Sequence, residues 1–90
     1  MKLQREVQII NRLGLHARAC AKLVKPAGQF ESDIVLEQGE AHADAKSIMG
    51  LMMLAATQGT RLQLITDGTD AEEASNQVQQ LIADRFGEDE

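Results

Sequence analysis

The sequence predicts an α+β fold, with a four-stranded antiparallel sheet that carries three helices on one face, in the chain order β-α-β-β-α-β-α. Four short segments alternate polar and apolar residues, as strands do when one face of their sheet meets solvent. Three other segments repeat apolar residues at helical spacing. A strand, a helix and a second strand at the start, with another strand late in the chain, match the split βαβ plan. In that plan the last strand lies between the first two.

The N-terminal half is expected to form a strand, a helix and a hairpin. Arg5–Ile10 alternates polar and apolar residues and ends in a β-branched pair, which is typical of a strand. Ala17–Ala27 places apolar residues on one helical face, with Pro26 in the last turn of the predicted helix. Ser32–Ala45 is predicted to be a hairpin that turns near Gly39.

The C-terminal half is expected to add a short apolar helix, a strand and a long helix. Ser47 is a candidate N-cap for the short helix, and Arg61–Thr66 alternates like a strand. Asp70 is predicted to cap the long helix, whose buried stripe extends to Phe86. The whole chain is expected to be one domain, 1–90, in which residues 87–90 form a solvated, mobile acidic tail.

The composition argues against several classes of function. A net charge of −5 and the presence of only two aromatic residues disfavour binding to nucleic-acid phosphates or stacking on bases. A single cysteine, Cys20, cannot form an internal disulfide and fits a reducing compartment. The N-terminus lacks the pattern of a signal peptide, and no apolar run approaches a membrane span. A cytoplasmic protein is therefore expected.

The segment GLHARACAK, Gly14–Lys22, places a histidine where a strand-like segment gives way to a helix. Metal binding by His16 is disfavoured, because only His42 and Cys20 offer similar ligands and their spacing is not that of a metal site. A catalytic Cys–His pair is disfavoured because Cys20 falls on the apolar helix face. No metal or cofactor is expected. A histidine that caps or braces the helix is the ordinary structural role.

The residues around His16 favour another role, the acceptance of a phosphoryl group. The first helical N–H groups, near Ala17 and Arg18, lack intrahelical partners, and the positive end of the helix dipole lies there. The Arg18 guanidinium adds a second group that binds anions. Neutral imidazole is abundant near pH 7, nucleophilic, and a good donor of phosphoryl groups. From the residues alone, the structural and phosphoryl-accepting roles both stay open.

The segment GLHAR, followed later by AKSIMGLMMLAATQGT, resembles HPr, the histidine phosphocarrier family of the phosphoenolpyruvate-dependent phosphotransferase system. The resemblance extends over nearly the whole chain. It implies an open-faced β-sandwich, phosphorylation of His16 on the ring nitrogen nearer the backbone, and stabilisation of the phosphoryl group by Arg18. It also implies a carrier protein and not an enzyme, which accepts phosphate from Enzyme I and passes it to EIIA-type domains.

The resemblance further implies regulation and docking. Ser47 matches a serine that an ATP-dependent HPr kinase modifies in many bacteria, while its plain role as an N-cap stays open. The short apolar helix has more apolar residues than it can bury, and methionine adapts its shape to different partners. Leu51, Leu54 and Ala55 are expected to face the core. The residues expected to dock partners are Leu15, Cys20, Ile48, Met49 and Met52.

Departures from the family pattern leave some points open. Ala19 stands where many members have proline, and Leu13 stands where some have a polar residue that can bond the imidazole, so the group that orients the ring is not evident. These features lean toward proteobacterial members, including the regulatory nitrogen-related branch. The alternative function is a regulatory module that acts by docking. A ferredoxin-like ligand-binding domain would explain the element order but not GLHAR. A monomer is expected.

Overall fold

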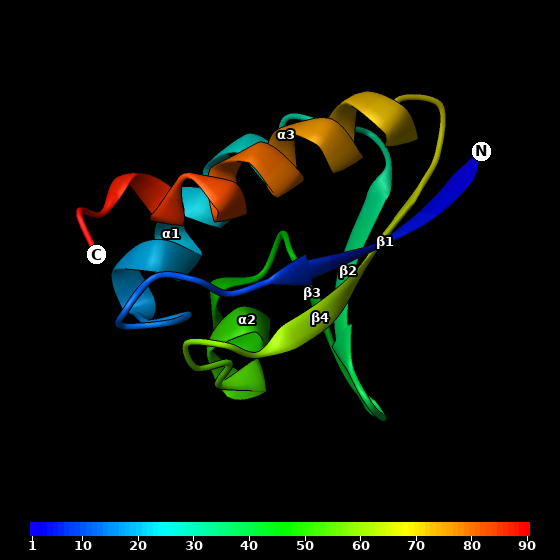
Figure 1. Cartoon of the computed structure of the whole chain (residues 1–90). Coiled ribbons are helices and arrows are strands. Elements are labelled where there is room, and N and C mark those ends of the chain that lie inside the picture. The colour runs from blue at the N-terminus through cyan, green and yellow to red at the C-terminus, as the bar shows by residue number, and fades with distance from the viewer.

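Four strands form one antiparallel sheet, and the helices pack against it from one side (Figure 1). The computed structural model describes residues 1–90. The elements are β1 (Lys2–Gln8), α1 (Ala17–Ala27), β2 (Asp33–Gln38), β3 (Ala41–Asp44), α2 (Ile48–Leu54), β4 (Arg61–Asp67), α3 (Ala71–Ala83) and the 3-10 turn η1 (Arg85–Gly87). The strand order is β1-β4-β2-β3, so the late strand lies between the first two. The predicted fold class is confirmed. No helix in the structure combines the length and apolar character needed to cross a bilayer.

The predicted helix Ala17–Ala27 and the predicted hairpin turn are confirmed, but the first strand is displaced toward the N-terminus. It pairs with β4 from Lys2 opposite Asp67 to Gln8 opposite Arg61. Pairing with the whole of β4 therefore sets its length. Ile9 leaves the regular ladder, although its N–H still donates to the Thr60 carbonyl at 2.9 Å.

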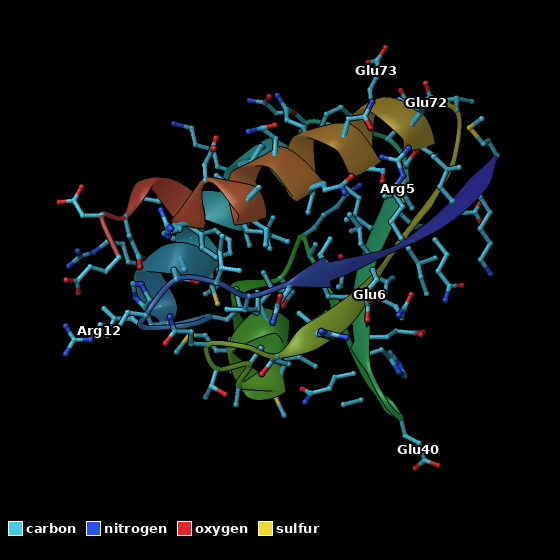
Figure 2. The ribbon with its side chains drawn as sticks, in the orientation of Figure 1. Arg5, Glu6, Arg12, Glu40, Glu72 and Glu73 are labelled. Carbon is cyan, nitrogen blue, oxygen red and sulfur yellow. The ribbon has the colours of Figure 1, made fainter.

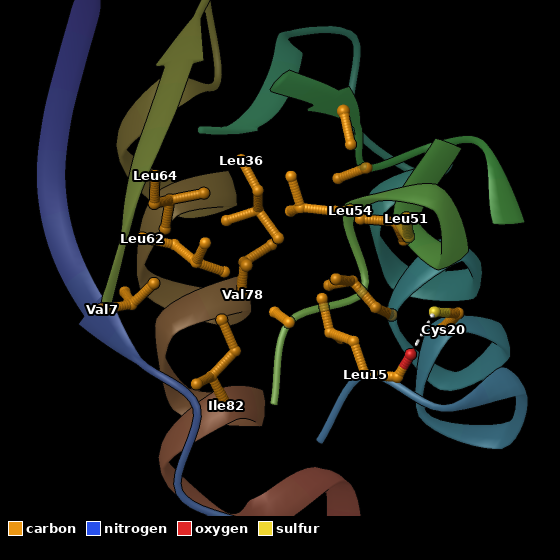
Figure 3. Packing of buried hydrophobic residues seen from close by; sticks show 14 of the residues in the cluster. Val7, Leu15, Cys20, Leu36, Leu51, Leu54, Leu62, Leu64, Val78 and Ile82 are labelled. Carbon is orange, nitrogen blue, oxygen red and sulfur yellow. Dashed lines mark hydrogen bonds between the residues drawn. The ribbon is translucent and has the colours of Figure 1, made fainter. Parts of the chain in front are cut away.

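One cluster of buried apolar side chains joins the sheet to all three helices (Figure 3). Leu36 and Leu64 enter it from neighbouring strands, and Leu51 enters it from α2. Burial of each such side chain stabilises the fold by about 1.5–3 kcal/mol. The prediction that Ala55 faces the core is wrong. Ala55 is the left-handed C-cap of α2 (φ 52°) and is exposed, while Ala56 is buried just after it.

The two predicted helix caps differ in outcome. The Ser47 hydroxyl accepts a hydrogen bond from the Gly50 N–H at 3.0 Å, which confirms an N-cap on α2. Asp70 stands at the N-cap position of α3 but makes no capping bond. Its carboxylate instead accepts bonds from the backbone N–H of Glu31 and of Ser32, both at 2.9 Å, and from the Ser32 hydroxyl at 2.5 Å. The Asp70 carboxylate therefore accepts hydrogen bonds from the loop between α1 and β2 and not, as expected, from the first N–H groups of α3.

The segment after α3 folds back across the start of α1 (Figure 1). Arg85, Phe86 and Gly87 all have positive φ, between 54° and 78°, and Phe86 is 1% exposed. Left-handed backbone is unfavourable for residues with a Cβ, and burial of Phe86 offsets that cost. The predicted helical stripe therefore ends in a separate turn. The expectation of a solvated tail fails at Glu88, whose side chain is only 15% exposed.

Replacement of Asp70 by alanine is expected to lower the melting temperature by several degrees at neutral pH, because the loop N–H groups lose their acceptor. The hydrogen bond from Ser32, followed by that from the Glu31 N–H, holds the pKa of the Asp70 carboxyl below its usual value. A depressed folded-state pKa stabilises the protein above the unfolded value, near pH 4, and that stabilisation is lost as pH falls through the folded value. The difference from wild type should therefore shrink in acid.

Thermal unfolding followed by circular dichroism between about pH 3 and pH 7 checks this prediction. Glu73→Ala is the control, since Glu73 is an exposed acid in the first turn of the same helix (Figure 2) and makes no side-chain hydrogen bond. An Asp70→Ala deficit that stays constant down to pH 3 would contradict the assignment.

Candidate functional site

His16 lies immediately before α1, as the sequence predicts. Its backbone is extended (φ −75°, ψ 174°), and its carbonyl accepts the first helical hydrogen bond, from the Cys20 N–H at 3.0 Å. Its side chain makes no capping bond. The N–H groups of Ala17 and Arg18 precede that first bond, so they have no intrahelical acceptor. A side chain that can accept a group therefore lies beside donors that can bind an anion.

The turn before His16 is fixed by a close approach to the chain that follows α2. Gly14 has φ 68°, and a Cβ at this position would lie 2.5 Å from the Ala56 carbonyl oxygen. The next N–H, that of Leu15, donates to the same oxygen at 2.9 Å. Only glycine allows both the left-handed backbone and this distance. The contact holds the start of α1 beside α2.

The His16 ring has one engaged nitrogen. Nε2 pairs with the Glu88 carboxylate, and the other carboxylate oxygen accepts a bond from Nδ2 of Asn11 at 3.0 Å. The same Asn11 nitrogen donates to the Gly14 carbonyl at 2.8 Å, and Asn11 is 1% exposed. Asn11, Glu88 and His16 form what we call the Asn–Glu–His chain. No hydrogen bond engages the other ring nitrogen, Nδ1.

Sequence reasoning missed two of these three residues. Glu88 lies 72 positions from His16, in a segment that was predicted to be solvated, so no local pattern links them. Asn11 stands in a turn, where asparagine is common for reasons unrelated to a site. Only the return of the C-terminal segment to α1 brings them together.

The Glu88 carboxylate is held in its ionised form. Burial acts to raise its pKa, but hydrogen bonds from Asn11 and His16, together with the nearby charges of His16 and Lys22, outweigh burial and lower the pKa below its usual value. An ionised carboxylate only accepts hydrogen bonds. Glu88 therefore requires a proton on Nε2 of His16.

A cavity of about 350 Å³ opens beside the ring. Arg18 lines it, is exposed and makes no hydrogen bond or ion pair, so its guanidinium is available to an anion. Arg12 also lines it but is paired with Glu90 at 2.9 Å, and both side chains are strongly exposed. The other residues that line the cavity are Leu13, His16, Glu88 and Asp89.

Two of the predicted docking residues are buried, and that prediction is wrong for them. Leu15, which precedes α1, is 5% exposed and Cys20, on α1, is fully buried, because both side chains lie in the hydrophobic core. The Cys20 thiol donates to the Leu15 carbonyl at 3.4 Å (Figure 3), and burial raises the pKa of the thiol. A buried, protonated thiol is unreactive, so a catalytic Cys–His pair is also excluded.

The other predicted docking residues are exposed. Ile48, Met49 and Met52 lie on the outer side of α2, and Met53 joins them with 82% of its surface exposed. We call these four residues the α2 apolar surface. Leu13 is also largely exposed and lines the cavity beside His16. Sequence reasoning placed neither Met53 nor Leu13 among the docking residues.

No metal-binding group accompanies the site. The structure holds no cluster of three or more histidine, cysteine or acidic side chains placed to bind an ion. Cys20 is buried in the core, and His42 is exposed on β3. The site consists of the His16 imidazole with its Glu88 partner, the start of α1 and the free guanidinium of Arg18.

These features define a protein whose site can hold a phosphoryl group, and comparison with known proteins identifies the family. Residues 3–84 match the family model described as "PTS HPr component phosphorylation site". A phosphocarrier protein HPr of Cupriavidus necator is 54% identical, over 98% of this chain and 99% of its own length. A phosphocarrier protein NPr of Shewanella violacea is 42% identical, over 97% of this chain and 96% of its own length. The crystal structure of HPr-C-His from Thermoanaerobacter tengcongensis superposes with a TM-score of 0.93 at 40% identity, covering 98% of this chain and 99% of that one.

The chain belongs to the HPr family of phosphocarrier proteins of the phosphotransferase system.

Replacement of Gly14 by alanine is expected to lower the free energy of unfolding by about 3 kcal/mol or more. The left-handed backbone alone costs about 1–2 kcal/mol, and the new methyl group would displace the chain at Ala56. Denaturation in urea measures the loss.

Gly39→Ala is the matched control, because Gly39 has a similar φ of 60° but a Cβ there would meet no atom within 4 Å. The loss of stability in Gly39→Ala should therefore equal the cost of the left-handed backbone alone. Equal losses in the two variants would show that the contact between Gly14 and Ala56 is not tight.

Proposed function

We propose that this chain accepts a phosphoryl group on Nδ1 of His16 from phosphorylated Enzyme I and passes it to a histidine of an EIIA-type domain. The observation that carries the proposal is the state of the imidazole, with Nε2 engaged by Glu88 and Nδ1 without a partner. Nδ1 can then act as a nucleophile near neutral pH. Between these two steps the protein is a carrier and has no turnover of its own.

Each transfer is a displacement at phosphorus. The Nδ1 lone pair forms the new N–P bond while the bond to the donor nitrogen breaks, and the donor nitrogen keeps that electron pair. The transition state spreads negative charge over the equatorial oxygens, so positioned donors lower the barrier. We assign this role to the N–H groups of Ala17 and Arg18 and to the Arg18 guanidinium. Each such charge-assisted bond contributes about 1.5–3 kcal/mol.

The surroundings of His16 suit successive docking on different partners. The α2 apolar surface lies on the helix that the contact between Gly14 and Ala56 holds beside the start of α1. Methionine side chains adapt to differently shaped surfaces, as a carrier with a donor and several acceptors requires. We propose that a single copy performs the transfer, because one chain supplies the imidazole, the Arg18 guanidinium and the Glu88 carboxylate of the site.

Ser47 has a second role in this proposal. Its hydroxyl caps α2, next to the α2 apolar surface. A phosphate on Ser47 would retain an acceptor for the Gly50 N–H while adding charge where partners dock, so it would weaken docking and leave the fold intact. This property favours a regulatory docking module as the second candidate function. That function needs the α2 apolar surface but not a reactive Nδ1.

His16→Ala is expected to abolish labelling by radioactive phosphoenolpyruvate and a bacterial Enzyme I. The wild-type label should be labile in acid and stable in base. His42→Ala is the control, because His42 is the only other histidine and lies exposed on β3. It should be labelled at the wild-type rate.

The melting temperature of His16→Ala should stay within a few degrees of wild type, because His16 is partly exposed. Cooperative unfolding well below that value would assign His16 a structural role. An unlabelled wild type with both sugar-branch and nitrogen-branch Enzyme I would favour the docking module.

Arg18→Ala is expected to slow phosphoryl transfer by about 10- to 100-fold, because one charge-assisted contact to the transferred group is lost. Arg18→Lys should recover part of the rate, since a lysine supplies charge without the guanidinium fork.

Rapid-quench measurement of the labelled protein tests this prediction. Arg12→Ala is the control, because Arg12 lines the same cavity but is already paired with Glu90. If Arg12→Ala and Arg18→Ala slow transfer equally, general positive charge and not a specific contact is responsible.

A further inference from the structure

We infer that Glu88 is a positioning residue for phosphoryl transfer, which holds the His16 ring in the tautomer that presents the Nδ1 lone pair. The inference rests on the proposed function and adds to it a residue from the opposite end of the sequence. It is carried by the Asn–Glu–His chain described above, in which each member has a defined partner.

Hydrogen bonds fix the position of the Glu88 side chain beside the His16 ring. Both of its oxygens are engaged, one by Nε2 of His16 and one by Nδ2 of Asn11. Asn11 is itself 1% exposed and anchored to the Gly14 carbonyl. The turn that precedes His16 and the carboxylate that faces its ring are therefore joined through one buried amide.

The backbone that carries Glu88 is anchored on both sides. Before it, Phe86 is buried in the core, and its carbonyl accepts a bond from Nζ of Lys22 at 2.9 Å. After it, the backbone carbonyl of Glu90 accepts a hydrogen bond from the backbone N–H of Arg12. The carboxylate is thereby held against the ring by anchors in α1 and in the turn before it.

The chemistry follows from what a carboxylate can accept. An ionised Glu88 requires the proton of the neutral ring to be on Nε2, so the lone pair is on Nδ1, beside the helix end. When Nδ1 forms the N–P bond, the ring becomes positively charged, and the adjacent carboxylate stabilises that charge. The Nε2 proton stays on the ring throughout. On donation, the electron pair of the N–P bond returns to Nδ1 and the ring becomes neutral again.

The same contact determines which nitrogen reacts. Glu88 covers Nε2 and places negative charge beside it, which repels an incoming phosphoryl group. Nδ1 has no hydrogen-bond partner, and the free guanidinium of Arg18 lines the cavity beside the ring. Glu88 therefore directs the reaction to one of two nitrogens that are similarly nucleophilic in free imidazole.

Glu88→Gln is the sharpest test, because the glutamine amide can donate a hydrogen bond to Nε2 and so favour the proton on Nδ1. We expect transfer from Enzyme I to slow by about 10- to 100-fold. Nitrogen-15 chemical shifts of His16, measured at about pH 8.5 on the unphosphorylated protein, should move away from the Nε2–H tautomer. Glu88→Ala should remove the preference for the Nε2–H tautomer without favouring the Nδ1–H tautomer instead.

Asp89→Asn is the matched control, since Asp89 is the neighbouring acid, lines the same cavity and makes no hydrogen bond. Its rate and tautomer should equal those of wild type. Thermal unfolding of every variant establishes that the domain remains folded.

The outcomes separate this inference from the proposed function. A slower Glu88→Gln with a changed tautomer supports it. A wild-type transfer rate in Glu88→Gln overturns it, and so does a slower rate with an unchanged tautomer, which would mean a structural role. If wild type accepts no label at all, the proposed function fails, while the nitrogen shifts still report whether Glu88 sets the tautomer.

Discussion

The approach of Gly14 to the Ala56 carbonyl is the constraint on which the rest of the site depends. It ties the turn before α1 to the chain that leaves α2, at a distance that no other side chain allows. As a result, the start of α1, where His16 lies, is held beside α2, the helix that carries the α2 apolar surface. The Gly14 carbonyl, on the other side of the same residue, binds Asn11. One backbone position thus holds α1 beside α2 and anchors the buried amide behind the imidazole.

Features encoded by local patterns could be predicted from the sequence. The apolar period and Pro26 located α1, the alternation in β2 and β4 located the centre of the sheet, and Ser47 was recognised as a cap. The position of His16 before α1 also follows from local sequence, because a helix end follows directly after it. These predictions succeeded since the interactions involved span only a few residues.

Features that depend on distant segments could not be predicted. Asp70 was expected to cap its own helix, but a loop from elsewhere in the chain reaches its carboxylate. Leu15 was expected to dock partners, yet its side chain is buried in the core. Glu88 contacts His16 only because a left-handed turn reverses the chain after α3. Each of these outcomes requires the tertiary arrangement, about which a local pattern carries no information.

The distribution of sulfur in this protein has a consequence for its chemistry in oxidising conditions. The thiol of Cys20 is fully buried, whereas Met49 and Met53 expose most of their surface on α2. Oxidants will therefore reach the thioethers well before the thiol. Conversion of Met49 or Met53 to the sulfoxide makes this region polar while leaving the core and the imidazole unchanged. Oxidative damage would thus appear first as weaker recognition by partners, in a protein whose melting curve and reactive ring remain normal.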